Sequence, residues 1–198
     1  SDNFLTKRNR RFRKFPLIYK LVKIKKELEA NNIEISDFEE KRLQPVSYDI
    51  LLGNKFETII SHKTSFVDPA RGVFPETHLI TIEDGEEFVL HPGKTVLGTS
   101  KDYFGSQKYL IQLSGKSSLA RIGLVVHNTA GIVNPGHFLH ITFELYNAGK
   151  VPIILRPGME IAQILFSGIS SSLDKTYVDT GRFNGDNWGK NFTNKDNQ

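Results

Sequence analysis

The chain has 198 residues, of which 38% are hydrophobic and 24% charged, values that are ordinary for a globular protein. This length predicts one domain with a substantial core. No run approaches 18 consecutive apolar residues, which excludes a membrane-spanning helix, and the first residues lack the apolar core of a secretory signal. Cysteine is absent, so disulfides, thiol catalysis and thiolate metal sites are excluded, and we expect a cytoplasmic location, in a host cell if the gene is viral.

The net charge of +4 is concentrated near the N-terminus. Within residues 1–15, six lysines and arginines oppose the single acid Asp2, a balance of +5 that leaves about −1 for the rest. The body of the protein is therefore not basic, which argues against a nucleic-acid partner for it. We interpret residues 1–15 as a flexible, solvated arm; a phosphate-binding or partner-binding arm is the alternative.

Residues 16–31 predict one amphipathic helix, because lysines separate four apolar residues at helical spacing, Leu17, Leu21, Ile24 and Leu28. We expect this helix to pack on the protein itself. A second, short helical turn is predicted at residues 36–40, where serine and glutamate stand three apart as in a capping box.

From residue 43 onward the pattern changes to short runs typical of strands. Ten such runs lie at residues 48–52, 56–60, 78–82, 86–90, 95–99, 109–113, 122–126, 140–146, 151–156 and 160–166. Turn dipeptides separate them, at residues 53–54, 84–85, 92–93, 135–136, 148–149 and 157–158. We therefore predict an all-β barrel or sandwich with an N-terminal helix, forming a single domain over residues 16–180. The polar, glycine- and asparagine-rich segment 181–198 is expected to be a mobile tail.

The segment Ser114–Ser118 (SGKSS) is similar to a phosphate-binding loop. A Walker A motif needs a glycine five positions before Gly115, where this chain has Leu110, so that interpretation fails. A glycine turn with backbone N–H groups, one cation and two hydroxyls still suits a polyphosphate, and Arg121 adds a planar fork of donors. A polar turn without function is the alternative.

The run 128–146 predicts a tight turn at residues 134–136, followed by a strand with two different faces. Its alternation places Ile141, Phe143 and Leu145 on one face and Glu144, flanked by Thr142 and Tyr146, on the other. A carboxylate on an apolar strand suits a general acid or base. The alternative is a glutamate in water, or one paired with Arg121 or Arg156.

Three histidines could be combined into a zinc site on paper, namely His127, His137 and His140. Alternation places His140 on the face of Glu144, but nothing fixes the direction of His137. We therefore expect no structural metal site.

Several segments resemble the dCTP deaminase family. Residues 115–124 (GKSSLARIGL) are similar to its signature G-R-S-S-L-A-R-x-G-L. Further similar segments follow in the family's order, at residues 43–49, 52–56, 90–93, 126–130, 135–136, 143–152 and 155–159. The resemblance covers about residues 43–177.

This resemblance implies a dUTPase-like β-clip fold, a homotrimer with active sites shared between subunits, and deamination without zinc. The implied reaction converts dCTP to dUTP and ammonia, which supplies dUTP for thymidylate synthesis, with Mg²⁺ bound through the triphosphate. The implied catalytic residues are Glu144 as proton carrier, with Ser117, Arg121 and the carbonyl of Ala130 holding water and the pyrimidine. The implied substrate-binding residues are Lys116, Ser118, Thr129, Asn134, Gln163, Tyr177 and Arg182.

The chain also departs from the family pattern. Lys116 replaces an arginine, so a bidentate clamp becomes a point charge. Asn134 replaces the aspartate that serves pyrophosphate cleavage in bifunctional relatives, and an amide cannot act as a base, so we expect the product to keep its phosphates. Other substitutions near the base or sugar, which leave the preferred nucleotide open, are Ile132, His137 and Leu139. In the tail, the usual tyrosine–glutamine–glycine pattern is reduced to Phe183, Asp186 and Gly189. The alternatives are a dUTPase or bifunctional deaminase-pyrophosphatase, and a non-catalytic nucleotide-binding trimer.

Overall fold

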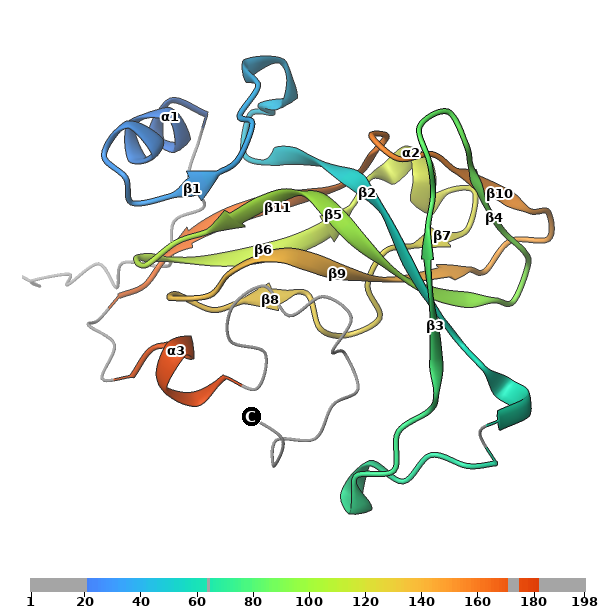
Figure 1. Ribbon diagram of the computed structural model, residues 1–198. Coiled ribbons are helices and arrows are strands. Elements are labelled where there is room, and N and C mark those ends of the chain that lie inside the picture. The colour runs from blue at the N-terminus through green and yellow to red at the C-terminus, as the bar shows by residue number, and fades with distance from the viewer. Residues whose placement is uncertain (1–20, 64, 171–174, 182–198) are drawn as a thin grey trace, which may run out of the picture.

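The computed structural model describes residues 21–63, 65–170 and 175–181, and its architecture is almost entirely β, as predicted (Figure 1). The strands of its large sheet are β1 (Glu34–Ile35), β2 (Tyr48–Ile59), β3 (Thr77–Thr81), β5 (Thr95–Gly105), β6 (Tyr109–Gly115), β7 (Leu124–Val125), β8 (Ile132–Val133), β9 (Phe138–Asn147) and β11 (Glu160–Gly168). Two further strands, β4 (Phe88–Leu90) and β10 (Ile153–Leu155), form a small sheet of their own.

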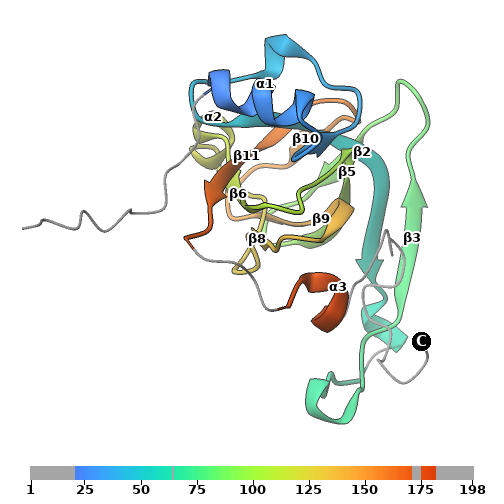
Figure 2. The same ribbon diagram turned by 90° about the vertical axis from the view of Figure 1, so that its left-hand side faces the viewer.

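Within the described residues, seven strands of the large sheet follow the order β7-β9-β5-β2-β11-β6-β8, while β1 pairs with β5 and β3 with β2. Strands distant in sequence are therefore neighbours, as in a barrel-like curl (Figure 2). The core fills the inside of this curl with alternate residues of the central strands, including Phe56, Phe143, Leu145, Ile164 and Phe166, each 0% exposed. Each such side chain stabilises the fold by roughly 1.5–3 kcal/mol.

All ten predicted runs contain strand residues, but the predicted turn at residues 53–54 is wrong. β2 continues through Gly53, and its ladder with β5 shifts register between Leu52 and Phe56. A Cβ at Gly53 would lie 2.6 Å from Thr99 Cγ2 and 2.9 Å from the Thr99 carbonyl oxygen. The glycine permits close approach of two strands here, rather than a turn.

The predicted N-terminal helix is confirmed as α1 (Leu21–Glu29), with Ile24 fully buried; residues 16–20 and the basic arm lie outside the described residues. The helical turn predicted at residues 36–40 is wrong. The Ser36 hydroxyl accepts a hydrogen bond from the Tyr103 N–H (2.9 Å) instead of capping a helix. A 3₁₀ turn, η1 (Glu40–Arg42), comes later in the chain. A partner on another strand outweighed the local capping pattern.

The remaining short helical elements are η2 (Ser61–Lys63), η3 (Pro69–Arg71), α2 (Ser117–Ala120) and α3 (Tyr177–Thr180). β2 and β3 form a hairpin that extends beyond the body of the protein (Figures 1 and 2). In both views α2 and α3 lie at opposite ends of the molecule. None of the helices in the described ranges has the length and apolar character needed to cross a membrane.

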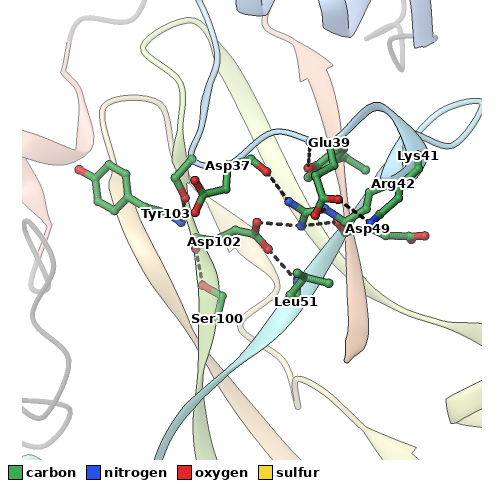
Figure 3. Close-up of polar contacts among 11 residues, drawn as sticks. Asp37, Glu39, Lys41, Arg42, Asp49, Leu51, Ser100, Asp102 and Tyr103 are labelled. Atoms are coloured by element: carbon green, nitrogen blue, oxygen red, sulfur yellow. Dashed lines mark hydrogen bonds and ion pairs between the residues drawn. The ribbon is translucent and has the colours of Figure 1, made fainter. Parts of the chain in front are cut away.

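A buried ion pair fixes the segment that precedes β2 (Figure 3). The Arg42 guanidinium lies 2.8 Å from Asp102 Oδ1, and these side chains are 1% and 2% exposed. Arg42 also donates to the carbonyls of Asp37 (2.8 Å) and Asp49 (3.3 Å), while Asp102 Oδ2 accepts from the Leu51 N–H (2.7 Å). The start of β2 is thereby fixed against β5.

Candidate functional site

A hollow of about 400 Å³ lies where the start of β2, α2 and β11 meet. Four of the predicted site residues line it, namely Lys116, Ser117, Ser118 and Gln163. Asp49 and Ser47, at the start of β2, line it as well. The structure thus brings these four predicted site residues together around one concave surface.

Lys116 forms ion pairs with two carboxylates at this hollow. Its ammonium group lies 2.7 Å from Asp49 Oδ2 and 2.6 Å from Glu160 Oε2. Partial burial opposes the charged form, but the hydrogen bonds and charges of the two carboxylates outweigh it and raise the pKa of Lys116 above its ordinary value. Lys116 is therefore a cation at every physiological pH.

Gln163 connects the strands around the hollow. Its Nε2 donates to the carbonyl of Gly115 (3.0 Å), and its Oε1 accepts from the Ser47 hydroxyl (2.7 Å). In the sheet, Gln163 stands between Asp49 of β2 and Ser114 of β6. These contacts fix the position of the loop that carries Lys116.

Glu144 lies on β9, and the predicted alternation of that strand is confirmed. Ile141, Phe143 and Leu145 are buried (6%, 0% and 0% exposed), whereas Glu144 is half-buried on the other face. Its carboxylate Oε2 accepts a hydrogen bond of 2.7 Å from the backbone N–H of Asn128. The carboxylate is therefore oriented by backbone and lies beside the loop that follows Asn128.

That loop contains two further predicted site residues, Thr129 and Ala130, both exposed. Its end is held by a hydrogen bond from the Leu113 N–H to the Gly131 carbonyl (2.7 Å). The loop is therefore fixed to β9 at its start and to β6 at its end.

Neither arginine that the sequence offered as a partner neutralises Glu144. Arg156 lies 2.5 Å from Glu87 Oε2 instead. Arg121, directly after α2, is exposed and forms no ion pair with any residue in the described ranges. The Glu144 carboxylate and the Arg121 guanidinium are both available to a ligand.

The turn at Asn134 lies in another part of the fold. The Tyr177 N–H donates to the Pro135 carbonyl (3.1 Å), and the Tyr177 ring stacks on that of His137 at 3.9 Å and 12°. This contact docks α3 next to β8 and β9, at the opposite end from α2 (Figure 1). Asn134 is exposed in the same turn, and Arg182 lies outside the described residues. Asn134 and Tyr177 are therefore separated from the hollow within one chain.

The three histidines have different surroundings. His137 stacks on Tyr177, and His140 meets the Tyr103 ring edge-on at 5.5 Å. Among residues 21–63, 65–170 and 175–181, no three His, Asp or Glu side chains are grouped so that they could hold a metal. Zinc-independent chemistry stays a prediction.

The site also contains residues that the sequence analysis did not assign. Ser47 and Asp49 stand two apart at the start of β2, so strand alternation could have placed both on one face. Glu160 had no such signal, because its contact with Lys116 depends on how β11 packs beside α2. A second hollow, of about 420 Å³, is lined by residues that include Lys55, Lys101 and His140, and it contains none of the predicted site residues.

Comparison with known proteins identifies the family. The family profile described as dCTP deaminase-like matches residues 18–169. The chain belongs to this family. The predicted membership is confirmed, and so is the predicted all-β class with an N-terminal helix.

Relatives of this dCTP deaminase-like chain cover most of its length. It is 37% identical over 166 residues to a protein of Beutenbergia cavernae named dCTP deaminase, dUMP-forming, covering 82% of this chain and 86% of the relative. A protein of Clavibacter michiganensis subsp. michiganensis with the same name is 40% identical, covering 76% of each chain. The crystal structure of 2'-deoxycytidine 5'-triphosphate deaminase from Agrobacterium tumefaciens superimposes with a TM-score of 0.60 at 18% identity, over 80% of this chain. This chain spans half the length of that protein.

Proposed function

We propose that this protein hydrolytically removes the 4-amino group of a deoxycytidine nucleotide, with dCTP as its substrate. The main observation behind this proposal is the position of Glu144 on the polar face of β9. Its carboxylate is oriented by the Asn128 N–H and is not neutralised by either candidate arginine. The names of the relatives support the substrate, since both are dCTP deaminases.

In the proposed mechanism Glu144 moves the protons. It takes one proton from the water that attacks C4 of cytosine and delivers that proton to N3. It then takes the second proton from the resulting C4 hydroxyl and delivers it to the amino group, which leaves as ammonia while the C4 carbonyl of uracil forms. One water is consumed and one ammonia is released for each uracil nucleotide formed. Ser117, Arg121 and the Ala130 carbonyl orient the water and the pyrimidine edge. Glu144 acts on water without zinc in this proposal, which the lack of cysteine in the sequence supports.

The hollow around Lys116 is the proposed phosphate site. Lys116 supplies a permanent positive charge, and the exposed hydroxyls of Ser117 and Ser118 supply donors beside it. Mg²⁺ would enter as part of the nucleotide substrate, and Lys116, Ser117 and Ser118 would hold the phosphates that carry it. Thr129 and Asn134 are proposed to contact the nucleoside, while Tyr177 and Arg182 close over it.

The proposed homotrimer would bring these separated groups together. Within one chain the turn at Asn134 and the hollow lie apart, so a site shared between neighbouring subunits is a way for both to contact one nucleotide. Light scattering would give a mass of about 67 kDa, three times 22.4 kDa. A mass of 22.4 kDa, that of a single chain, at the protein concentration used in the activity assay would reject the shared site.

The nucleotide product is proposed to be dUTP, with all three phosphates retained. Asn134 has no ionisable group with which to activate a second water for pyrophosphate cleavage. The relatives favour a second candidate, since their names specify dUMP as the product. In that case another carboxylate would have to take over the role that Asn134 cannot perform.

One product analysis separates these possibilities. The purified protein is incubated with Mg²⁺ and dCTP, dCMP, CTP or dUTP, and the products are separated by chromatography. Release of dUTP and ammonia from dCTP is the expected result. Release of dUMP and pyrophosphate would establish the second candidate, and cleavage of dUTP alone would indicate a pyrophosphatase. A failure to convert any cytosine nucleotide would reject deamination and leave a nucleotide-binding protein.

Glu144→Gln tests the proton carrier. The amide keeps the shape and the Asn128 contact but does not titrate, so kcat for deamination should fall by at least about 100-fold while dCTP binding is retained. Glu76→Gln, an exposed carboxylate on the β2–β3 hairpin, is the control and should leave kcat unchanged. If the Glu144→Gln enzyme still deaminates dCTP, the proposed role of Glu144 is wrong, although the proposed substrate is right.

A further inference from the structure

Lys116 is held by two carboxylates that differ in burial and support. The Asp49 side chain is 3% exposed, accepts a second hydrogen bond from Gln44 Nε2 (3.0 Å), and belongs to a residue whose carbonyl accepts from the buried Arg42 (Figure 3). Glu160 is 45% exposed at the first position of β11. Asp49 is therefore the fixed partner of Lys116, and Glu160 is the partner that can move away.

These three side chains leave the phosphate hollow without a positive surplus. Lys116 contributes one positive charge, and Asp49 and Glu160 contribute two negative charges. Lys116 is the one cation among the described residues that line the hollow. A polyphosphate that enters must replace Glu160 as a partner of the ammonium group, and it then lies near a displaced carboxylate.

We propose that Glu160 is a specificity-determining residue that makes this hollow accept polyphosphates complexed with a divalent cation and discriminate against metal-free ones. The proposal deepens, and rests on, the proposed phosphate role of the hollow. Glu160 does not contact the reacting atoms; it acts by competing for Lys116 and by repelling anionic charge.

The size of the effect follows from charge. An ion pair with an exposed partner contributes little to stability, so the Lys116–Glu160 contact can open readily. A metal-free triphosphate carries about four negative charges, and its Mg²⁺ complex about two. At a distance of roughly 8 Å in water, the repulsion of those two extra charges by one carboxylate corresponds to about a fivefold difference in affinity.

The test measures binding by titration calorimetry, with and without Mg²⁺, in wild type and Glu160→Gln. Inorganic tripolyphosphate probes the hollow independently of the base. dCTP is used in the Glu144→Gln background, so that turnover does not interfere. The ratio of the metal-free Kd to the Mg²⁺ Kd should fall about fivefold in Glu160→Gln. Glu76→Gln, which also removes one exposed carboxylate from an ion pair, should leave the ratio unchanged.

Thermal melting of each variant establishes that it is folded. If Glu160→Gln keeps the wild-type ratio, the role of Glu160 is overturned while the proposed function stands. If wild type binds neither Mg²⁺–tripolyphosphate nor Mg²⁺–dCTP, the phosphate hollow and the proposed function both fail.

Discussion

Asp102→Asn should be among the most destabilising conservative changes in this protein. The substitution keeps the volume but removes the charge that faces Arg42, a guanidinium that is only 1% exposed. Breaking a buried pair on one side typically costs about 3–5 kcal/mol, because the remaining charge stays desolvated. Glu39, 3.4 Å from Arg42 Nε, recovers part of this loss, so we expect about 3 kcal/mol.

The measurement is urea unfolding at pH 7, followed by circular dichroism at a fixed protein concentration, because assembly would make stability depend on concentration. Arg42→Met should cost a similar amount. The double variant should cost clearly less than the sum of the two, since neither charge is then left alone.

Arg71→Met is the matched control, because the Arg71–Asp68 pair is exposed and should contribute about 1 kcal/mol or less. If Asp102→Asn costs no more than this control, the burial argument is refuted. If the loss of unfolding free energy in the double variant equals the sum of the losses in Asp102→Asn and Arg42→Met, the two side chains do not stabilise each other as a pair.

Three further changes test other parts of the structure. Gly123 and Gly158 both have positive φ (93° and 83°), but only at Gly123 would a Cβ lie 2.5 Å from the Gly149 nitrogen. Gly123→Ala should therefore lower the free energy of unfolding in urea by about 1–3 kcal/mol more than Gly158→Ala. Equal losses would mean that the close approach is unimportant. Burial opposes ionisation of Glu27, but hydrogen bonds from Tyr109, Asn32 and Lys108 outweigh it and hold the pKa of Glu27 below its ordinary value of 4.5. The ionised side chain should therefore stabilise the fold above about pH 4.5, and this contribution should be lost as the pH falls through the lower pKa of the folded state. The difference between the free energies of unfolding of wild type and Glu27→Gln should therefore be largest at neutral pH and shrink as the pH falls through the lowered pKa of Glu27. A difference that does not change with pH would contradict this origin. Asn134→Asp should convert part of the deaminated product to dUMP and pyrophosphate, as seen by chromatography, and a product that remains dUTP would show that an aspartate here is not sufficient.

The positions of the strands could be predicted from the sequence because each depends on local pattern. Alternation along residues 140–146 placed Glu144 opposite Ile141, Phe143 and Leu145, and the structure buries those three. The same local reasoning failed at Ser36 and at Gly53. In both cases a partner distant in sequence, Tyr103 or Thr99, decided the conformation.

The sequence by itself determined the all-β class, the family and the residue types of the candidate site, since these reside in short, ordered segments. Only the tertiary structure showed that Asp49 and Glu160 bind Lys116 and that Gln163 fixes its loop. Such contacts join strands that are more than 40 residues apart, and their energies depend on distance and burial. A linear pattern fixes neither, because both arise only when β2, α2 and β11 pack together.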